Sequence, residues 1–135
     1  MKRIHLHLGV TDLVKSRAFY ERLFQAKPKK IKKDYLQWIL DDPKINFAIS
    51  TRSSRKGVDH FGIQVNSIQE LSKIREGFSK SSLSTHSDGE VTCCYAKSEK
   101  SWVTDPNGIA WEAYYTMDDA EMFHSEEEKS ESSCC

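Results

Sequence analysis

Two stretches of the chain alternate between apolar and polar residues, and each leads into a segment with helical spacing. They are HLHLGV at residues 5–10 and HFGIQV at residues 60–65. Alternation with a period of two is typical of a β-strand that buries one face. The pattern therefore predicts two strands, each followed by a helix, with the apolar face of each strand packed under the helices.

The two stretches are copies of one pattern. At a constant offset of 55 residues and without a gap, His5 aligns with His60, and the apolar residues of the two strands coincide. Self-similarity at a fixed spacing indicates a duplicated unit of secondary structure. We therefore expect two modules, at about residues 1–52 and 57–117, within a single domain that spans residues 1–117.

Both predicted helices carry start signals. Asp12 suits the N-cap of the first helix, and Ser67 with Glu70 has the spacing of a capping box at the start of the second. Apolar residues then recur on roughly one side of each helix, which is typical of a helix that covers a sheet. They are Leu13, Phe19, Leu23 and Phe24 in the first helix and Ile68, Leu71, Ile74 and Phe78 in the second.

Short runs with β-like composition follow each helix. An Asp-Pro turn precedes the last run of each half, at residues 42–43 and 105–108, and this chemistry suits a hairpin. Each half therefore reads as strand, helix and two or three strands, which predicts an α+β fold. The runs lie at residues 35–40 and 45–50 in the first half and at residues 91–97, 102–104 and 109–115 in the second.

Charge and cysteine content narrow the classes of protein. The 20 basic and 20 acidic residues give a net charge of zero, which does not favour a nucleic-acid partner. No apolar run approaches the roughly 18 residues of a membrane span, and the N-terminus lacks an apolar signal region. The cysteines form two adjacent pairs, unlike a disulfide framework. We expect a cytoplasmic protein with reduced thiols.

The end of the chain has a different composition. Residues 118–135 contain seven acidic residues and few apolar ones, and they end in Cys134 and Cys135. Such a segment cannot bury enough apolar surface to fold by itself. We expect a flexible acidic tail whose thiols either deliver substrate or are incidental.

Three residues could hold a metal ion. With one extra residue in the second turn, the repeat aligns Ala48 with Glu112, and Glu112 lies on the less apolar face of its strand, as His5 and His60 do. A lone histidine at a strand start is usually an ordinary polar residue, but symmetry-matched positions favour a shared site. Two histidines and a carboxylate suit Fe(II), Mn(II), Ni(II), Co(II) and Zn(II). His7 lies on the same face as His5, and we assign it to a supporting position.

These residues lie in segments that resemble a known superfamily. HLHLGVTDLVKSRAFYERLF, DHFGIQV and WVTDPNGIAWEAY are similar to the vicinal-oxygen-chelate superfamily of glyoxalases, extradiol dioxygenases and bleomycin or fosfomycin resistance proteins. The resemblance implies two βαβββ modules that form a cupped mixed sheet. It also implies metal ligands at His5, His60 and Glu112, with no fourth ligand at Ala48. We expect a homodimer on the same ground.

A pair of adjacent thiols is the second candidate feature. Cys93 and Cys94 follow a turn-prone stretch at residues 87–89. Thiolates are soft ligands that suit a centre such as trivalent arsenic. In a regular strand the two side chains would point to opposite faces, so joint binding requires a loop or a bulge. The alternative is that both are small buried apolar residues.

A narrower resemblance joins the two features. The TCCYA segment, the DDPKINFAIST segment and the terminal cysteine pair resemble the branch of cadmium-induced CadI proteins and ArsI-type carbon–arsenic lyases. That branch implies Fe(II)- and dioxygen-dependent cleavage of trivalent organoarsenicals, with Cys93 and Cys94 holding arsenic. We also assign Tyr95 and Tyr114 to supporting positions.

Two alternatives stay open at this point. The chain could bind cadmium or arsenite through its thiols without turnover. It could instead be a different metalloenzyme of the glyoxalase or resistance type, in which case Cys93 and Cys94 would be incidental. The sequence does not settle the resident metal or the preference between methyl and aryl arsenicals.

Overall fold

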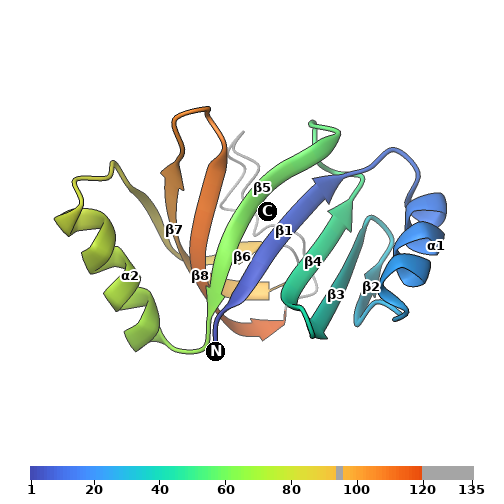
Figure 1. The fold of residues 1–135 in the computed structure, drawn as a ribbon, viewed down its shortest axis with the longest axis horizontal. Helices are drawn as coiled ribbons and strands as arrows, with labels where there is room; N and C mark the ends of the chain where they lie inside the picture. The colour runs from blue at the N-terminus through green and yellow to red at the C-terminus, as the bar shows by residue number, and fades with distance from the viewer. Residues whose placement is uncertain (94–95, 120–135) are drawn as a thin grey trace.

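The fold consists of two copies of one module, placed side by side in a single curved sheet. A computed structural model describes residues 1–93 and 96–119 (Figure 1). The first module contains β1 (Arg3–Gly9), α1 (Leu13–Phe24), β2 (Lys30–Lys32), β3 (Tyr35–Asp41) and β4 (Lys44–Ser50). The second contains β5 (Gly57–Val65), α2 (Ile68–Lys80), β6 (His86–Cys93), β7 (Ala96–Thr104) and β8 (Ala110–Asp119).

The strand order repeats the module symmetrically about the centre of the sheet. Across the described residues the eight strands run β2-β3-β4-β1-β5-β8-β7-β6. In each module the first strand is parallel to the last one, while β1 and β5 are antiparallel to each other. The predicted α+β fold, with two βαβββ modules in a cupped mixed sheet, is confirmed.

The register between β1 and β5 agrees with the sequence repeat. His5 lies opposite Gly62 and His7 lies opposite His60. At the offset of 55 residues, each of these pairs is the image of the other. A pseudo-twofold axis therefore passes between β1 and β5, and it brings His5 and His60 close together.

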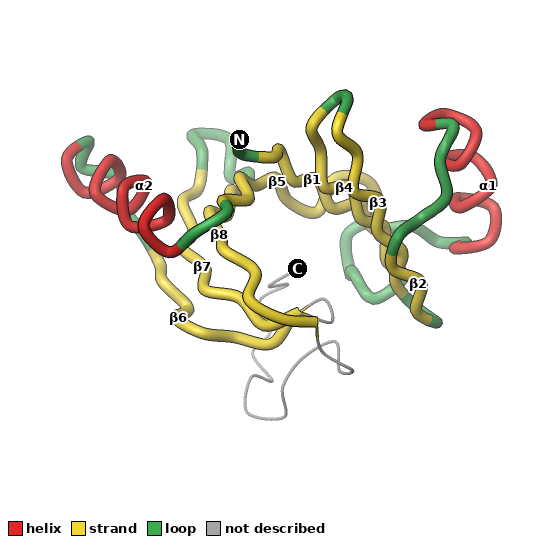
Figure 2. Tube along the Cα trace, turned by 90° about the horizontal axis from the view of Figure 1, so that it is seen from below, coloured by secondary structure: helices red, strands yellow, loops and turns green. Residues whose placement is uncertain are grey.

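The sheet is curved, and the helices lie on its outer side. Figure 2 shows α1 and α2, the two helices of the described residues, outside the two ends of the curve. The apolar faces of the strands pack under the helices as predicted. One core cluster contains Leu36, Trp38, Phe47 and Ile49, with Leu6, Leu8, Tyr20 and Phe24 against it, and the other contains Val65, Leu71 and Ala113.

Both predicted helix starts are confirmed, but the apolar stripe on α1 is partly wrong. The Asp12 side chain accepts a hydrogen bond from the Lys15 backbone N–H, and the Ser67 hydroxyl accepts one from the Glu70 N–H. Phe19 and Leu23, however, are 58% and 59% exposed. Successive residues of a helix with 3.6 residues per turn point in directions about 100° apart. Phe19 and Leu23 therefore point away from the side on which the next residue of each, Tyr20 and Phe24, lies.

The packed stripe of α1 instead uses the residues that follow these two. Tyr20 and Phe24 lie against the first core cluster, together with Leu13. The rings of Tyr20 and Phe47 have centroids 4.6 Å apart, and those of Phe24 and Phe47 are 5.0 Å apart. Tyr20 was not among the apolar residues predicted for this helix, yet it packs against the core.

Strand bounds in the second module differ from the predicted ones. The run expected at residues 91–97 is divided, because β6 ends at Cys93 and β7 begins at Ala96, with these two residues paired. Cys94, Tyr95 and residues 120–135, which include Cys134 and Cys135, lie outside the described residues. β8 runs to Asp119, two residues past the expected domain boundary at 117. Neither of the described helices is long and apolar enough to cross a membrane.

Candidate metal centre

Three donor atoms from both modules meet on the inner side of the sheet. His5 Nε2 lies 3.2 Å from His60 Nε2. Oε1 of Glu112 lies 3.3 Å from His5 Nε2 and 3.4 Å from His60 Nε2. All three residues are buried. The structure thus brings together His5, His60 and Glu112, the three residues predicted as metal ligands.

Gly62 makes this meeting possible. In the sheet, Gly62 lies between His5 on β1 and Glu112 on β8. A Cβ atom at this position would lie 2.7 Å from Glu112 Cγ and 2.8 Å from the Glu112 backbone oxygen. The missing side chain therefore leaves the space in which the carboxylate approaches both imidazoles.

Each histidine is oriented by a hydrogen bond from its other ring nitrogen. His5 Nδ1 donates to the backbone carbonyl of Asn46 at 3.1 Å, and His60 Nδ1 donates to Asp59 Oδ1 at 2.7 Å. The Ser53 hydroxyl donates to the other oxygen of Asp59. Such contacts fix the tautomer of a metal-binding histidine and leave the Nε2 lone pair for the metal.

The protonation states differ between the two histidines. Burial lowers the pKa of His5 to about 4, although Glu112 opposes the shift. Burial also disfavours the charged form of His60, but Glu112 and Asp59 outweigh it and raise its pKa. Burial would raise the pKa of Glu112, but Lys100 and His60 outweigh it and hold the carboxyl below its usual range. The site therefore keeps a carboxylate and at least one neutral imidazole.

The donor set fits a divalent metal ion. Two neutral imidazoles that both carry a proton on Nδ1 present lone pairs to each other, so the close approach of their Nε2 atoms requires a proton or a cation between them. Two donors that each lie about 2.1 Å from one metal are separated by roughly 3.0 Å at a right angle and roughly 3.4 Å at a tetrahedral angle. The observed separations of 3.2–3.4 Å match this range.

Lys100 is a site residue that the sequence analysis missed. It is 3% exposed, and its Nζ donates to Glu112 Oε2 at 3.1 Å. The ammonium also lies over the rings of Trp102 and Tyr114, at 6.0 and 5.5 Å from their centroids. The run at 98–101 reads as a polar loop, yet it belongs to β7, where Lys100 and Trp102 share one face. The spacing of two residues between Lys100 and Trp102 could have indicated that Lys100 lies on the same face of a strand as Trp102.

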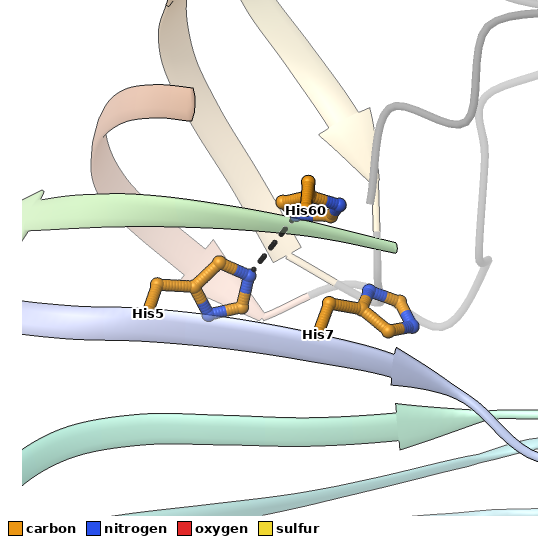
Figure 3. Close-up of side chains that lie close together, drawn as sticks. All are labelled: His5, His7 and His60. Carbon is orange, nitrogen blue, oxygen red and sulfur yellow. Dashed lines mark hydrogen bonds between the residues drawn. The ribbon is translucent and has the colours of Figure 1, made fainter. Parts of the chain in front are cut away.

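His7 and Tyr114, which the sequence analysis assigned to supporting positions, both lie beside His5. The Tyr114 ring contacts His5 at a centroid distance of 5.3 Å, and its hydroxyl accepts a hydrogen bond from Asn46 Nδ2. Burial raises the pKa of Tyr114, so the hydroxyl stays protonated. Figure 3 shows the side chains of His5, His7 and His60 gathered together, with two of them carried by β1. One ligand atom from each of these three histidines lies within 4.8 Å of the others.

The structure describes only part of the predicted thiol pair. Cys93 is the last residue of β6, and Cys94 and Tyr95 lie outside the described residues. The proposed meeting of the two thiols therefore stays a prediction.

The fold places two βαβββ modules in one curved sheet, and buried histidines and a glutamate lie on the inner side of that sheet. The protein is therefore of the class that has two such modules and an internal polar site. Over residues 2–113 the chain matches the model of the glyoxalase/bleomycin resistance protein/dioxygenase superfamily. The chain belongs to this superfamily, which confirms the resemblance seen in the sequence. The family and the histidine cluster suggest a divalent metal ion.

The alignments with known relatives cover most or all of this chain. The chain is 38% identical to a probable trivalent organoarsenical cleaving enzyme of Bacillus subtilis, covering 100% of this chain and 91% of the relative. It is 42% identical to a trivalent organoarsenical cleaving enzyme of Bacillus sp. strain MD1, covering 86% and 74%. The cadmium-induced protein CadI of Mycobacterium tuberculosis is 33% identical, covering 100% and 93%.

Solved structures share the fold at low sequence identity. A Mn(II)-bound glyoxalase from Novosphingobium aromaticivorans superposes with a TM-score of 0.62 at 15% identity, covering 95% of this chain and 44% of that one. An extradiol ring-cleaving dioxygenase from B. fuscum gives 0.62 at 17% identity, covering 90% and 34%. At such identity the likeness establishes the fold and leaves the metal and the substrate open.

Proposed function

We propose that this protein is an Fe(II)- and dioxygen-dependent carbon–arsenic lyase that acts on trivalent organoarsenicals. With methylarsonous acid, the overall reaction is CH3As(OH)2 + O2 → As(OH)3 + HCHO. The carbon–arsenic bond breaks, one oxygen atom goes to arsenic and the other to carbon, and dioxygen is the oxidant. All atoms and electrons balance without a further co-reactant.

The proposal rests on the close approach of three buried side chains. The Nε2 atoms of His5 and His60 and the Oε1 atom of Glu112 lie within 3.4 Å of one another. Two imidazoles and one carboxylate on one side of a metal leave positions open for dioxygen and substrate. Fe(II) held there supplies the one-electron chemistry that lets dioxygen react with an organic group. The names of the relatives, trivalent organoarsenical cleaving enzymes, support arsenic as the element that is handled.

The chain's own residues have separate roles in this proposal. Thiolates of Cys93 and Cys94 bind the arsenic atom, because soft sulfur donors suit a thiophilic centre. This capture holds the arsenic-bound carbon next to the metal and replaces a bimolecular encounter by a fixed geometry. His5, His60 and Glu112 are buried, so bulk water has little access to the donor atoms.

Hydrogen bonds to the histidines and to Glu112 keep the donor set ready for the metal. Asn46 and Asp59 fix the ring orientations of His5 and His60. Lys100 holds one oxygen of Glu112 and leaves the other directed at the two imidazoles. Each of these contacts joins residues of the chain itself, so little reorganisation is needed when substrate binds.

The test is a reconstitution under controlled oxygen. The protein is loaded anaerobically with Fe(II), methylarsonous acid is added, oxygen is admitted, and arsenite and formaldehyde are measured. Equal amounts of both products, dependent on iron and oxygen and absent from Glu112→Ala and from the Cys93→Ala/Cys94→Ala double variant, would support the lyase. Bound arsenic with a loaded metal site and no product would refute it for this substrate.

A second candidate is sequestration of a soft metal ion or arsenite by the thiols without turnover. The similarity to cadmium-induced proteins favours it. Stoichiometric cadmium binding that needs Cys93 and Cys94 but tolerates Glu112→Ala, together with the absence of oxygen-dependent product, would support sequestration over the lyase.

A further inference from the structure

His7 is a buried histidine whose ring has no hydrogen-bond partner among the described residues. Its exposure is 1%, and neither Nδ1 nor Nε2 meets a donor or acceptor within that part of the chain. Buried polar side-chain atoms are nearly always partnered, so an unpartnered one needs an explanation. Its close polar neighbours are the ligand atoms of His5 and His60, within 4.8 Å.

The ring of His7 lies against the candidate centre. Its centroid is 5.2 Å from that of His60 and 6.4 Å from that of His5, and Tyr35 lies on another side at 6.0 Å. Figure 3 shows the three imidazoles in one group, with His5 and His7 carried by the same strand. His7 therefore lies beside the two histidines, and the ligand atoms of the three rings are close enough to bind one ion.

The pseudo-twofold symmetry gives His7 a specific place in the donor set. In the second module, Glu112 on β8 lies beside Gly62 on β5. The matching pair in the first module is Ala48 on β4 beside His7 on β1. Full symmetry would put a second carboxylate at position 48. The first module has Ala48 there, which offers no donor, but it has a donor at the neighbouring position, His7.

We propose that His7 is a fourth protein ligand of the metal centre, which then has three imidazoles and one carboxylate, from His5, His7, His60 and Glu112. This inference rests on the proposed metal centre, but it does not depend on the substrate or on oxygen. His7 replaces the missing donor at Ala48 from the adjacent strand. The small side chain of Ala48 leaves room for the larger one beside it.

A third imidazole changes which metals the centre prefers. Nitrogen donors favour Co(II), Ni(II) and Zn(II) over Mn(II), which prefers oxygen. A centre that includes His7 therefore binds Zn(II) and Ni(II) more tightly, relative to Mn(II), than one formed by His5, His60 and Glu112 alone. Loss of a hydrogen-bonding residue behind a ligand costs ~10- to 100-fold in affinity, and loss of a ligand costs at least the upper end of that range.

The direct test counts the imidazoles on the metal in the full-length protein. Co(II) shifts the ring N–H protons of its histidine ligands far from other signals, and selective 15N labelling of histidine identifies them. Wild-type protein loaded with Co(II) should give three such N–H signals, and the His7→Gln variant should give two. Two signals in the wild type, unchanged in His7→Gln, would overturn the proposal.

Affinity measurements supply a second readout. His7→Gln should lose at least ~100-fold in Zn(II) affinity and less than ~10-fold in Mn(II) affinity. His86→Gln, a matched change of a histidine at the start of β6, should change neither. Equal losses for both metals in His7→Gln would contradict direct ligation and indicate a structural effect.

The results separate this inference from the proposed reaction. Three shifted N–H signals without arsenite production would support His7 as a ligand and refute the lyase. Absence of Co(II) binding by the wild-type protein would overturn this inference together with the metal centre.

Discussion

Glu112 directs its two carboxylate oxygens at different partners. Oε2 accepts a hydrogen bond from Lys100 Nζ at 3.1 Å, whereas Oε1 faces the Nε2 atoms of His5 and His60. A carboxylate held in this way has one oxygen available to a metal. Single-oxygen ligation leaves one more position free for substrate or dioxygen than two-oxygen ligation does.

Replacing Lys100 tests this division of the carboxylate. In Lys100→Met the side chain keeps about the length of the lysine hydrocarbon chain and loses the ammonium, so Glu112 is free to turn both oxygens to the metal. We expect kcat for arsenical cleavage to fall ~10- to 100-fold while the metal stays bound. Steady-state kinetics together with iron analysis of the purified variant would check this.

Lys15→Met, on the exposed face of α1, is the matched control and should keep wild-type kcat. Normal kcat in Lys100→Met would show that the ammonium has no part in setting the ligation of Glu112. Loss of the metal from this variant would instead assign Lys100 a role in metal retention.

We expect that even one added carbon atom at Gly62 destabilises the protein. A methyl group in Gly62→Ala would meet Glu112 Cγ at 2.7 Å and the Glu112 backbone oxygen at 2.8 Å, and the backbone atom cannot move away without shifting β8. We expect destabilisation by ~1–3 kcal/mol and weaker metal binding. Denaturant unfolding and calorimetric titration with Co(II) are the measurements.

Gly77 provides the opposite case for the same substitution. It lies inside α2, where an added Cβ would meet nothing within 4 Å. Gly77→Ala should therefore stabilise the protein by ~0.4–1 kcal/mol, because it restricts the unfolded chain and favours the helix. Similar stability changes in Gly62→Ala and Gly77→Ala would contradict the described packing at Gly62.

Asp59 should contribute to metal affinity through His60. In Asp59→Asn the charge that faces His60 Nδ1 is lost and the ring becomes a weaker and less well oriented donor. We expect Co(II) affinity to fall ~10- to 100-fold. Asp41→Asn is the control, since that carboxylate pairs with Arg3 and is 81% exposed, and it should leave Co(II) affinity unchanged. Unchanged affinity in Asp59→Asn would argue against His60 as a ligand.

Metal loading should raise thermal stability. A ligand that binds only the folded protein stabilises it by ~2.7 kcal/mol at a concentration 100 times its Kd. Addition of Zn(II) or Co(II) should therefore raise Tm, and a chelator should reverse the change. The His5→Ala/His60→Ala double variant should show no shift, and an equal shift in that variant would place the bound metal elsewhere in the chain.

The repeat made much of the fold predictable. Matching His5 to His60 and Ala48 to Glu112 already implied a twofold arrangement, and the strand register agrees with both matches. Helix starts at Asp12 and Ser67 were predictable because a cap needs only local hydrogen bonds. The assignment of metal ligation to His5, His60 and Glu112 stays a prediction.

Other features depended on contacts that the sequence does not encode locally. Lys100 lies between two predicted strand runs, because the polar residues 98–101 do not show the alternation with apolar residues that marks a strand. Phe19 and Leu23 looked like core residues because helical spacing alone does not fix which side of a broad apolar arc meets the sheet. The first difference concerns the extent of β7, and the second concerns which side of α1 meets the sheet.

The contrast between Gly62 beside Glu112 and His7 beside Ala48 has a consequence for how a reactant approaches the centre. Two identical modules would offer two equivalent directions, related by the twofold axis. Here the second module supplies a carboxylate beside a glycine, and the first supplies an imidazole beside an alanine. The two halves of the centre therefore differ in chemistry although their backbones are related by symmetry. An asymmetric reactant would meet a carboxylate on one side and an imidazole on the other.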